Sequence, residues 1–231
     1  MCAEESARKQ INMKLLDIKK NHMVHIYKRR VDLRSQYRGA VFLDRDGVII
    51  EDVNYISSTS DIKLVKGIKK SLEYLSKLGV KIVVVTNQSG ISREFFDWEK
   101  YEEITDKVIE YLGNKVIITA IYANGYKSQL ASKGWRKPEP GMIIEAANQL
   151  NIDLSRSILI GDRLSDMEAA TRANIKQVFY LPGANQYEMR ENISKRVDSN
   201  GYFLDNSLKA RIKVLDSLED IEMNEIIEII K

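Results

Sequence analysis

Two carboxylates at the end of an apolar run are the residues of this sequence best suited to chemistry. Asp44 and Asp46 follow the run Ala40–Leu43, and Gly47 comes directly after them. The run predicts a buried parallel strand, and open α/β sheets bind their ligands at the carboxyl ends of such strands. Like charges held this close tend to separate their pKa values, so one carboxylate can act as a nucleophile while the other carries a proton. Taken alone, these residues also fit an ordinary polar turn.

Three further polar clusters lie at predicted strand ends or in the loops that follow them. They are Thr86-Asn87, Arg136-Lys137-Pro138 and Gly161-Asp162 with Asp166. In a doubly wound sheet these positions converge on the edge that carries the first two acids. We therefore expect carboxylates, a hydroxyl, an amide and a lysine to meet in one place.

Phosphoryl transfer uses each of these groups. Asp44 can attack phosphorus and form an aspartyl-phosphate. Asp46 can protonate the leaving oxygen and later deprotonate the attacking water. Thr86 and Asn87 can donate hydrogen bonds to the phosphoryl oxygens, and Lys137 can neutralise charge on the transferred group and keep the nucleophile ionised.

A magnesium site is predicted from the same clusters. Asp162 and Asp44 together offer the hard carboxylate oxygens that Mg²⁺ prefers. The metal would offset the repulsion between an anionic nucleophile and an anionic substrate.

The elements that position these residues alternate between strands and helices. This order predicts an α/β fold, a Rossmann-like doubly wound parallel sheet with helices on both faces. Strands are expected at residues 40–43, 80–85, 116–122, 157–160 and 177–181, with an edge strand at 212–215, and helices at 68–78, 98–112, 142–150, 167–173 and 219–230. Most connections are short, so we expect no large cap domain, and an open mouth bordered by loops 51–61 and 124–136.

The segment before the first of these strands differs in charge from the rest of the chain. Residues 1–38 hold ten basic and four acidic residues, a formal charge of +6, whereas the whole chain carries +3. Apolar residues there, such as Ile11, Leu15 and Ile26, fall at roughly helical spacing, which predicts one or two amphipathic helices. We therefore divide the chain into a basic helical extension, 1–38, and a catalytic domain, 39–231.

The basic cluster Lys28-Arg29-Arg30 of this extension has two interpretations. It could bind nucleic acid or an anionic surface, but a solvated helix face is the commoner use of such a run. We expect a packing or dimerisation helix that makes a homodimer, and no nucleic-acid partner.

Composition limits the compartment and the metal chemistry. The apolar fraction is 44% and the charged fraction 30%, as in soluble globular proteins. We find no apolar stretch long enough to cross a bilayer and no apolar segment of the secretory type near the first residues, so we expect a cytoplasmic protein that does not bind membranes. The single cysteine, Cys2, excludes an internal disulfide and a cysteine-rich zinc site.

The ordered motifs resemble those of the haloacid dehalogenase superfamily of phosphatases. They are most similar to its capless branch of histidinol-phosphatases and heptose-bisphosphate phosphatases, over about residues 40–220. The motifs that carry the resemblance are Phe42-Leu43-Asp44-Arg45-Asp46-Gly47-Val48-Ile49, Thr86-Asn87-Gln88-Ser89-Gly90-Ile91, Arg136-Lys137-Pro138, Pro140-Gly141-Met142 and Gly161-Asp162 with Asp166-Met167.

The resemblance implies a role for each motif residue. Asp44 would be the nucleophile and Asp46 the general acid and base, with Mg²⁺ on Asp44, the main-chain carbonyl of Asp46, and Asp162. Thr86, Asn87 and Lys137 would hold the phosphate. The residues implied for the substrate side are Arg45, Asp52, Tyr55, Arg136 and Arg163.

Some of these residues have a second interpretation. Thr86 and Asn87 could cap a turn, and Arg136 could be an ordinary surface charge. Asp166 could be a first-turn helix acid or could bind the metal through water.

The sequence departs from the branch in its metal loop. The branch places cysteines and a histidine before Arg136-Lys137, whereas this chain has neither residue type between Ala123 and Arg136. We therefore expect no structural zinc, and a loop held by packing of Tyr122, Tyr126, Leu130 and Trp135. Glu94 also stands where the branch usually has glycine.

Three functions follow from this reading. The first is a Mg²⁺-dependent phosphatase of a small sugar phosphate, with heptose 1,7-bisphosphate expected to lose its 7-phosphate. Histidinol phosphate is the alternative substrate. A non-catalytic binding protein is the alternative class, which the complete acid and lysine set disfavours.

Overall fold

The chain forms one mixed sheet that is parallel over most of its width. The computed structural model describes residues 16–17, 23–28, 35–53, 55–56, 58–181 and 210–231. Within them, eight strands pair in the order β1-β2-β5-β4-β3-β6-β7-β8. The strands are β1 (Leu16–Asp17), β2 (Val24–Lys28), β3 (Ala40–Leu43), β4 (Lys81–Asn87), β5 (Ala120–Asn124), β6 (Ile158–Gly161), β7 (Gln177–Tyr180) and β8 (Arg211–Val214).

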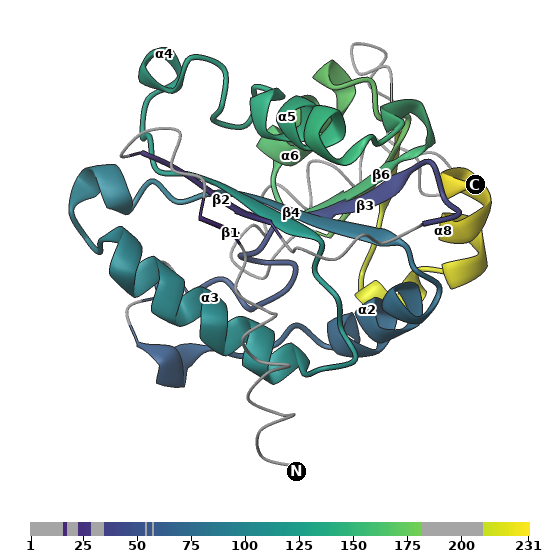
Figure 1. The fold of residues 1–231 in the computed structure, drawn as a ribbon, viewed down its shortest axis with the longest axis horizontal. Helices are drawn as coiled ribbons and strands as arrows, with labels where there is room; N and C mark the ends of the chain where they lie inside the picture. Colours follow the sequence, from purple (N-terminus) through teal and green to yellow (C-terminus); the bar gives the residue numbers. More distant parts are fainter. Residues whose placement is uncertain (1–15, 18–22, 29–34, 54, 57, 182–209) are drawn as a thin grey trace.

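The helices cover both faces of this sheet, as the sequence predicts. Figure 1 shows α5 (Gly141–Leu150) and α6 (Leu164–Arg172) on one face, and α2 (Ile68–Lys77) and α3 (Trp98–Leu112) on the other, with α8 (Met223–Ile230) beside β3 and β6. Two clusters of buried apolar side chains fill the layers between helices and sheet. The expected α/β doubly wound architecture is confirmed.

The centre of the sheet is a topological switch point. β3 pairs in parallel with β4 on one side and with β6 on the other, so the chain moves outward in both directions from β3. All four residues of β3 are buried, which explains why its sequence is a continuous apolar run. Ligands of open α/β sheets bind at such points, and the carboxyl end of β3 is where Asp44 lies.

The N-terminal segment contains a strand where we expected a helix. β2 pairs antiparallel with β5 along five residues, from Val24 opposite Asn124 to Lys28 opposite Ala120. Val24 and Ile26 belong to one core cluster and Tyr27 to the other, so alternate side chains enter opposite layers. Because both faces are buried, the run has no polar face, and its apolar residues imitate helical spacing. The helix prediction for these residues was therefore wrong.

This strand also changes the domain boundary placed at residue 38. β1 and β2 extend the same sheet as the strands of 39–231, so residues 16–17 and 24–28 are not a separate unit. The helix expected around Ile11 and Leu15, and the connection expected at 182–200, lie outside the described residues.

A substitution in β2 tests whether the strand is part of the core. Ile26 is fully buried, and Leu130 of α4 (Gln129–Ser132) is 92% exposed. We expect Ile26→Ala to lower the free energy of unfolding by about 2–4 kcal/mol, because it leaves a cavity between β2 and the helices above it. Leu130→Ala, the control, should change it by less than about 0.5 kcal/mol. Urea denaturation measures both, and equal effects would contradict the docking of β2.

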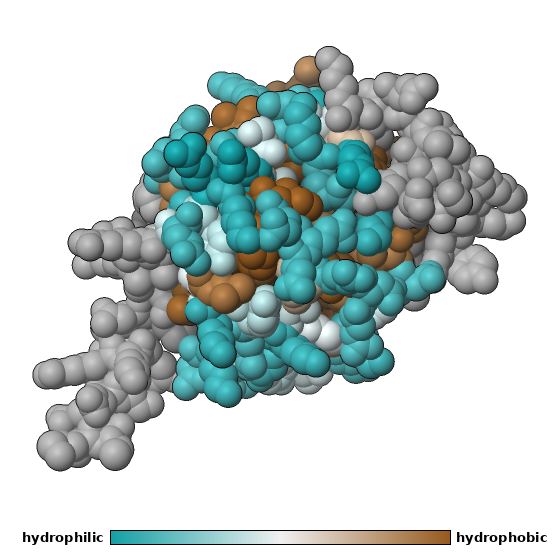
Figure 2. Space-filling model, turned by 90° about the vertical axis from the view of Figure 1, so that its right-hand side faces the viewer, coloured by the Kyte–Doolittle hydropathy of each residue, from teal (hydrophilic) through white to brown (hydrophobic). Residues whose placement is uncertain are grey.

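No helix within the described residues is long and apolar enough to cross a membrane. Figure 2 shows one face of the molecule, where hydrophilic side chains predominate and the apolar ones form small separate spots.

Candidate active site

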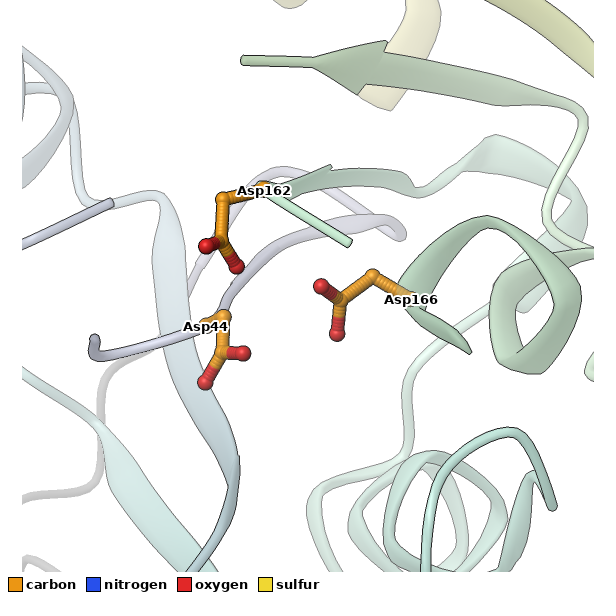
Figure 3. Close-up of side chains that lie close together, drawn as sticks. All are labelled: Asp44, Asp162 and Asp166. Carbon is orange, nitrogen blue, oxygen red and sulfur yellow. The ribbon is translucent and has the colours of Figure 1, made fainter. Parts of the chain in front are cut away.

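Three aspartates from different elements meet beside the end of the central strand. Asp44 follows β3, Asp162 follows β6, and Asp166 is the third residue of α6. Figure 3 shows their carboxylates turned toward one another, and one oxygen of each lies within 4.8 Å of the others. Gly47 allows this approach: its φ is 86°, and a Cβ there would lie 2.3 Å from the Asp162 carboxylate. The predicted convergence of the β3 and β6 motifs is therefore observed.

Lys137 supplies the positive charge of this cluster. Its Nζ lies 2.8 Å from Asp44 Oδ2 and 2.5 Å from Asp166 Oδ1, and donates to the carbonyl of Val85 at 2.9 Å. Burial alone would lower the pKa of Lys137, but the carboxylates of Asp166 and Asp44 raise it above its ordinary value. The lysine therefore stays protonated beside the Asp44 carboxylate.

The cluster holds more negative charge than one lysine balances. Burial raises the pKa of Asp44 to about 6 although Lys137 opposes the shift. Burial, together with the charges of Asp44 and Asp166, raises the pKa of Asp162 to about 8. Crowded, buried carboxylate oxygens of this kind are the donor set that a hard divalent cation stabilises. The residues present therefore fit Mg²⁺.

Asp166 is the first-turn helix acid of the first interpretation, and it also contacts Lys137. Its Oδ2 accepts a hydrogen bond from the backbone N–H of Arg163 at 3.0 Å, so it caps the first turn of α6. Its other oxygen faces Lys137. This pairing could not be predicted from local sequence patterns, because it joins a helix to a distant loop.

Asp46 lies outside the group of three aspartates. Its carboxylate accepts hydrogen bonds from Arg45 Nε at 3.1 Å and Nη2 at 3.0 Å, and from Gln88 Nε2 at 2.8 Å. The side chain is 24% exposed and borders the cleft described below. Asp44 and Asp46 thus lie on the same turn in different environments, because Asp44 is buried and Asp46 is partly exposed at the cleft.

Arg45 borders the cleft described below, but its side chain is almost fully enclosed by the protein. The residue is only 5% exposed, and its guanidinium lies over the ring of Tyr101, 5.1 Å from the centroid. Its hydrogen bonds go to Asp46 and to Gln88 Oε1. The neighbouring carboxylate and the aromatic face hold the guanidinium in place, so Arg45 supports Asp46, and its contact with a substrate stays a prediction.

Thr86 and Asn87 end β4 on the cleft side. Thr86 is fully buried, and its Oγ1 accepts a hydrogen bond from Gln88 Nε2 at 2.8 Å. Asn87 Nδ2 donates to the carbonyl of Lys137 at 3.1 Å, and the N–H of Lys137 donates to Asn87 Oδ1 at 3.2 Å. Asn87 therefore fixes the backbone of the lysine loop, and its amide is used between loops and not to cap its own turn.

A cleft of about 340 Å³ opens above these groups. Asp44, Asp46 and Lys137 line it, together with the six predicted substrate residues, which are Arg45, Asp52, Tyr55, Asn87, Arg136 and Arg163. Arg163 Nη2 pairs with Asp52 at 2.7 Å, and Arg136 donates to the carbonyl of Tyr126 at 2.9 Å. Arg136 is thus anchored and half-buried, which removes the interpretation as a free surface charge.

The cleft also gathers arginines. Burial lowers the pKa of Arg136, and the nearby charges of Arg93 and Arg163 lower it further. Arg93 ends the short helix η2 (Ile91–Arg93) and was not among our predicted site residues. Glu94 after it has a φ of 59°, which explains why the related branch favours glycine there.

The loop before Arg136 is held partly as expected. Tyr122 is buried, and Tyr126 and Trp135 pack against the core above the sheet. Leu130 is 92% exposed and does not anchor the loop, so that prediction was wrong. It lies on the short helix α4, which Figure 1 shows at the periphery of the molecule.

The chain is similar in sequence to a known family and to several curated proteins. Residues 35–180 match the haloacid dehalogenase-like hydrolase family. The chain is 36% identical over 151 residues to D-glycero-beta-D-manno-heptose-1,7-bisphosphate 7-phosphatase of Mesorhizobium japonicum, covering 62% of this chain and 70% of that protein. It is 36% identical over 143 residues to the protein of the same name from Escherichia coli K12, covering 59% and 75%.

Solved structures agree with this assignment. A HAD-like phosphatase from Mesorhizobium loti superposes with a TM-score of 0.74 at 28% identity, covering 93% of this chain and 96% of that one. D,D-heptose 1,7-bisphosphate phosphatase from B. bronchiseptica, complexed with magnesium and phosphate, shares the fold with a TM-score of 0.68 at 22% identity, covering 82% and 98%. The family match and the Asp44–Lys137 pair at the central strand end lead to one conclusion: the chain is a phosphoric monoester hydrolase that belongs to the haloacid dehalogenase-like hydrolase family.

Proposed function

We propose that this protein is a Mg²⁺-dependent phosphatase that acts through an aspartyl-phosphate on a sugar bisphosphate. Heptose 1,7-bisphosphate is the favoured substrate, with its 7-phosphate removed. The observation that carries the proposal is the Asp44 carboxylate, paired with Lys137 and facing two more aspartates, at the base of a cleft bordered by arginines. The names of the relatives support the choice of sugar.

The reaction has two steps, and in each of them Asp46 transfers one proton. Asp44 attacks phosphorus, the bond to the sugar oxygen breaks, and Asp46 gives that oxygen its proton. Asp46 then accepts a proton from water, which attacks the aspartyl-phosphate and releases inorganic phosphate. The net change is one ester and one water converted to an alcohol and phosphate, with both aspartates restored.

The remaining groups stabilise charge and position. Lys137 neutralises the transferred phosphoryl group and keeps Asp44 ionised. Asp44, Asp162 and the main-chain carbonyl of Asp46 would hold Mg²⁺, which offsets the repulsion between carboxylate and phosphate. Asp166 lies close enough to these acids to join the metal site directly or through water.

The arginines favour a substrate with a second phosphate. A guanidinium binds phosphate through two parallel hydrogen bonds. Arg93 lies close enough to Arg136 for its positive charge to lower the pKa of Arg136. Arg163 is paired with Asp52, so Arg136 carries more of this recognition. The carboxylate of Asp52 and the phenol of Tyr55 suit sugar hydroxyls. Histidinol phosphate would bring a cationic amine, which the arginines would repel.

Loss of Arg136 should distinguish these substrates. We expect Arg136→Ala to lower kcat/KM for heptose 1,7-bisphosphate about 100-fold and for a small monophosphate less than about 5-fold, because the second phosphate orients the reacting one. Release of inorganic phosphate with Mg²⁺, and its absence with EDTA, measures both. Arg156→Ala, which changes an exposed arginine of η3 (Leu154–Arg156), is the control.

Two outcomes of this assay would contradict the substrate assignment. One is an equal loss on both substrates in Arg136→Ala. The other is faster turnover of histidinol phosphate than of heptose bisphosphate by the unchanged protein.

Several expectations about location, zinc and partners stay predictions. They are a cytoplasmic location, a loop without structural zinc, no nucleic-acid partner, and a homodimer through the N-terminal segment. Most of that segment lies outside the described residues, and β2 is used within the sheet of its own chain.

A further inference from the structure

One side-chain amide connects two motifs of the site. Gln88 Nε2 donates to Asp46 Oδ2 and to Thr86 Oγ1, both at 2.8 Å. Its Oε1 accepts from Arg45 Nη2 at 3.0 Å. The reverse orientation of the amide would aim Oε1 at the Asp46 carboxylate, so these contacts allow one orientation. Gln88 is 4% exposed, and its side-chain nitrogen and oxygen both make their hydrogen bonds inside the protein.

The backbone holds this amide in place. The N–H of Gln88 donates to the carbonyl of Asn124 at 2.7 Å, and its carbonyl accepts from Ile91 at 3.1 Å. Arg45 is fixed from its other side by Tyr101. The amide and the guanidinium therefore form a rigid support behind Asp46.

We propose that Gln88 and Arg45 are positioning residues that set the direction of two reacting side chains, the acid of Asp46 and the hydroxyl of Thr86. Four hydrogen bonds from Arg45 and Gln88 fix the plane of the Asp46 carboxylate, which leaves one edge toward the cleft. Because Thr86 Oγ1 already accepts from Gln88, its own proton is available to a phosphoryl oxygen. This inference rests on the proposed role of Asp46 as general acid.

The proposal predicts a dependence on the leaving group. An alkyl alcohol departs poorly without a proton, so its release depends on the direction of Asp46. Nitrophenolate departs without a proton, so the rate of its release depends only on the hydrogen bond from Thr86 to the phosphoryl group. Loss of kcat/KM should therefore be larger for an alkyl ester, since kcat/KM reports the step in which the ester bond breaks.

The test compares β-glycerophosphate with p-nitrophenyl phosphate. We expect Gln88→Met, which keeps the length of the side chain, to lower kcat/KM about 100-fold on the alkyl ester and about 10-fold or less on the aryl ester. Arg45→Lys, which keeps the charge but not the forked contacts, should show the same preference. Gln177→Met is the matched control, because Gln177 is also 4% exposed but begins β7, at the amino end of the parallel strands, whereas the cleft lies at their carboxyl ends.

A double-mutant cycle with Asp46→Asn separates positioning from general structural damage. Once the acid is absent, Gln88→Met should no longer change the ratio between the two esters. Equal losses on both esters in Gln88→Met and Arg45→Lys, or a change of ratio that persists with Asp46→Asn, would overturn the inference. Failure of the unchanged protein to hydrolyse either ester would instead refute the proposed function.

Discussion

Replacing Asp44 by Asn should remove at least about 10⁴-fold of the turnover and leave the fold intact. The amide cannot attack phosphorus, and it is a weaker ligand for a cation than the carboxylate it replaces. Phosphate release from p-nitrophenyl phosphate and from a sugar phosphate measures the loss. Asp106→Asn, an exposed position of α3, should retain the activity of the unchanged protein.

The same variant should be at least as stable as the unchanged protein when metal is removed. Burial raises the pKa of Asp44, which means that the fold disfavours its charged form near neutral pH. Asn has the same shape without the charge, and Lys137 keeps its contact with Asp166. In EDTA we expect an equal or slightly higher Tm, and a smaller gain on adding Mg²⁺. A large fall in Tm, or residual turnover near the normal level, would contradict the role given to Asp44.

Much of this site could be predicted because it follows from the topology of a parallel sheet. Asp44 and Asp162 follow neighbouring strands, so their convergence needs only the order of the strands. The helix α3 was predicted with its observed bounds, since Asp97 caps its start and Gly113, with a φ of 83°, ends it.

Other features could not be read from local patterns. β2 is buried on both faces, so its sequence lacks the alternation that identifies a strand. The inward direction of Arg45 depends on Tyr101, which lies 56 positions later in the chain. Leu130 is apolar, but none of the described residues around α4 buries it, and it is 92% exposed. In each case tertiary contacts, and not the residue type, decide the outcome.

Replacing Lys137 by Met should affect both activity and stability, in contrast to Asp44→Asn. The methylene chain is kept, but Asp44 and Asp166 lose a buried cation that lies within 2.8 Å of each. Removing one member of a buried ion pair costs about 3–5 kcal/mol, since the partner charge stays in a poorly solvated place. We expect turnover about 10³-fold lower, because the transferred phosphoryl group also loses its positive neighbour. Lys66→Met, which breaks an exposed ion pair with Glu219, should change stability by less than about 1 kcal/mol.

The effect of Lys137→Met on stability should depend on pH. In the folded protein the pKa values of Asp44 and Asp162 are raised to about 6 and about 8, whereas an unfolded aspartate titrates near 4. Groups with raised pKa values stabilise the fold below the unfolded pKa, and that contribution is lost as pH rises through the folded values. Metal-free protein should therefore be more stable at pH 5 than at pH 8, and Lys137→Met should steepen this decline because the carboxylates lose their counter-charge. Adding Mg²⁺ should reduce the decline in the unchanged protein. Urea denaturation across pH 4–8 with EDTA measures the effect, and a stability that rises with pH in Lys137→Met would refute the buried-carboxylate account of the site.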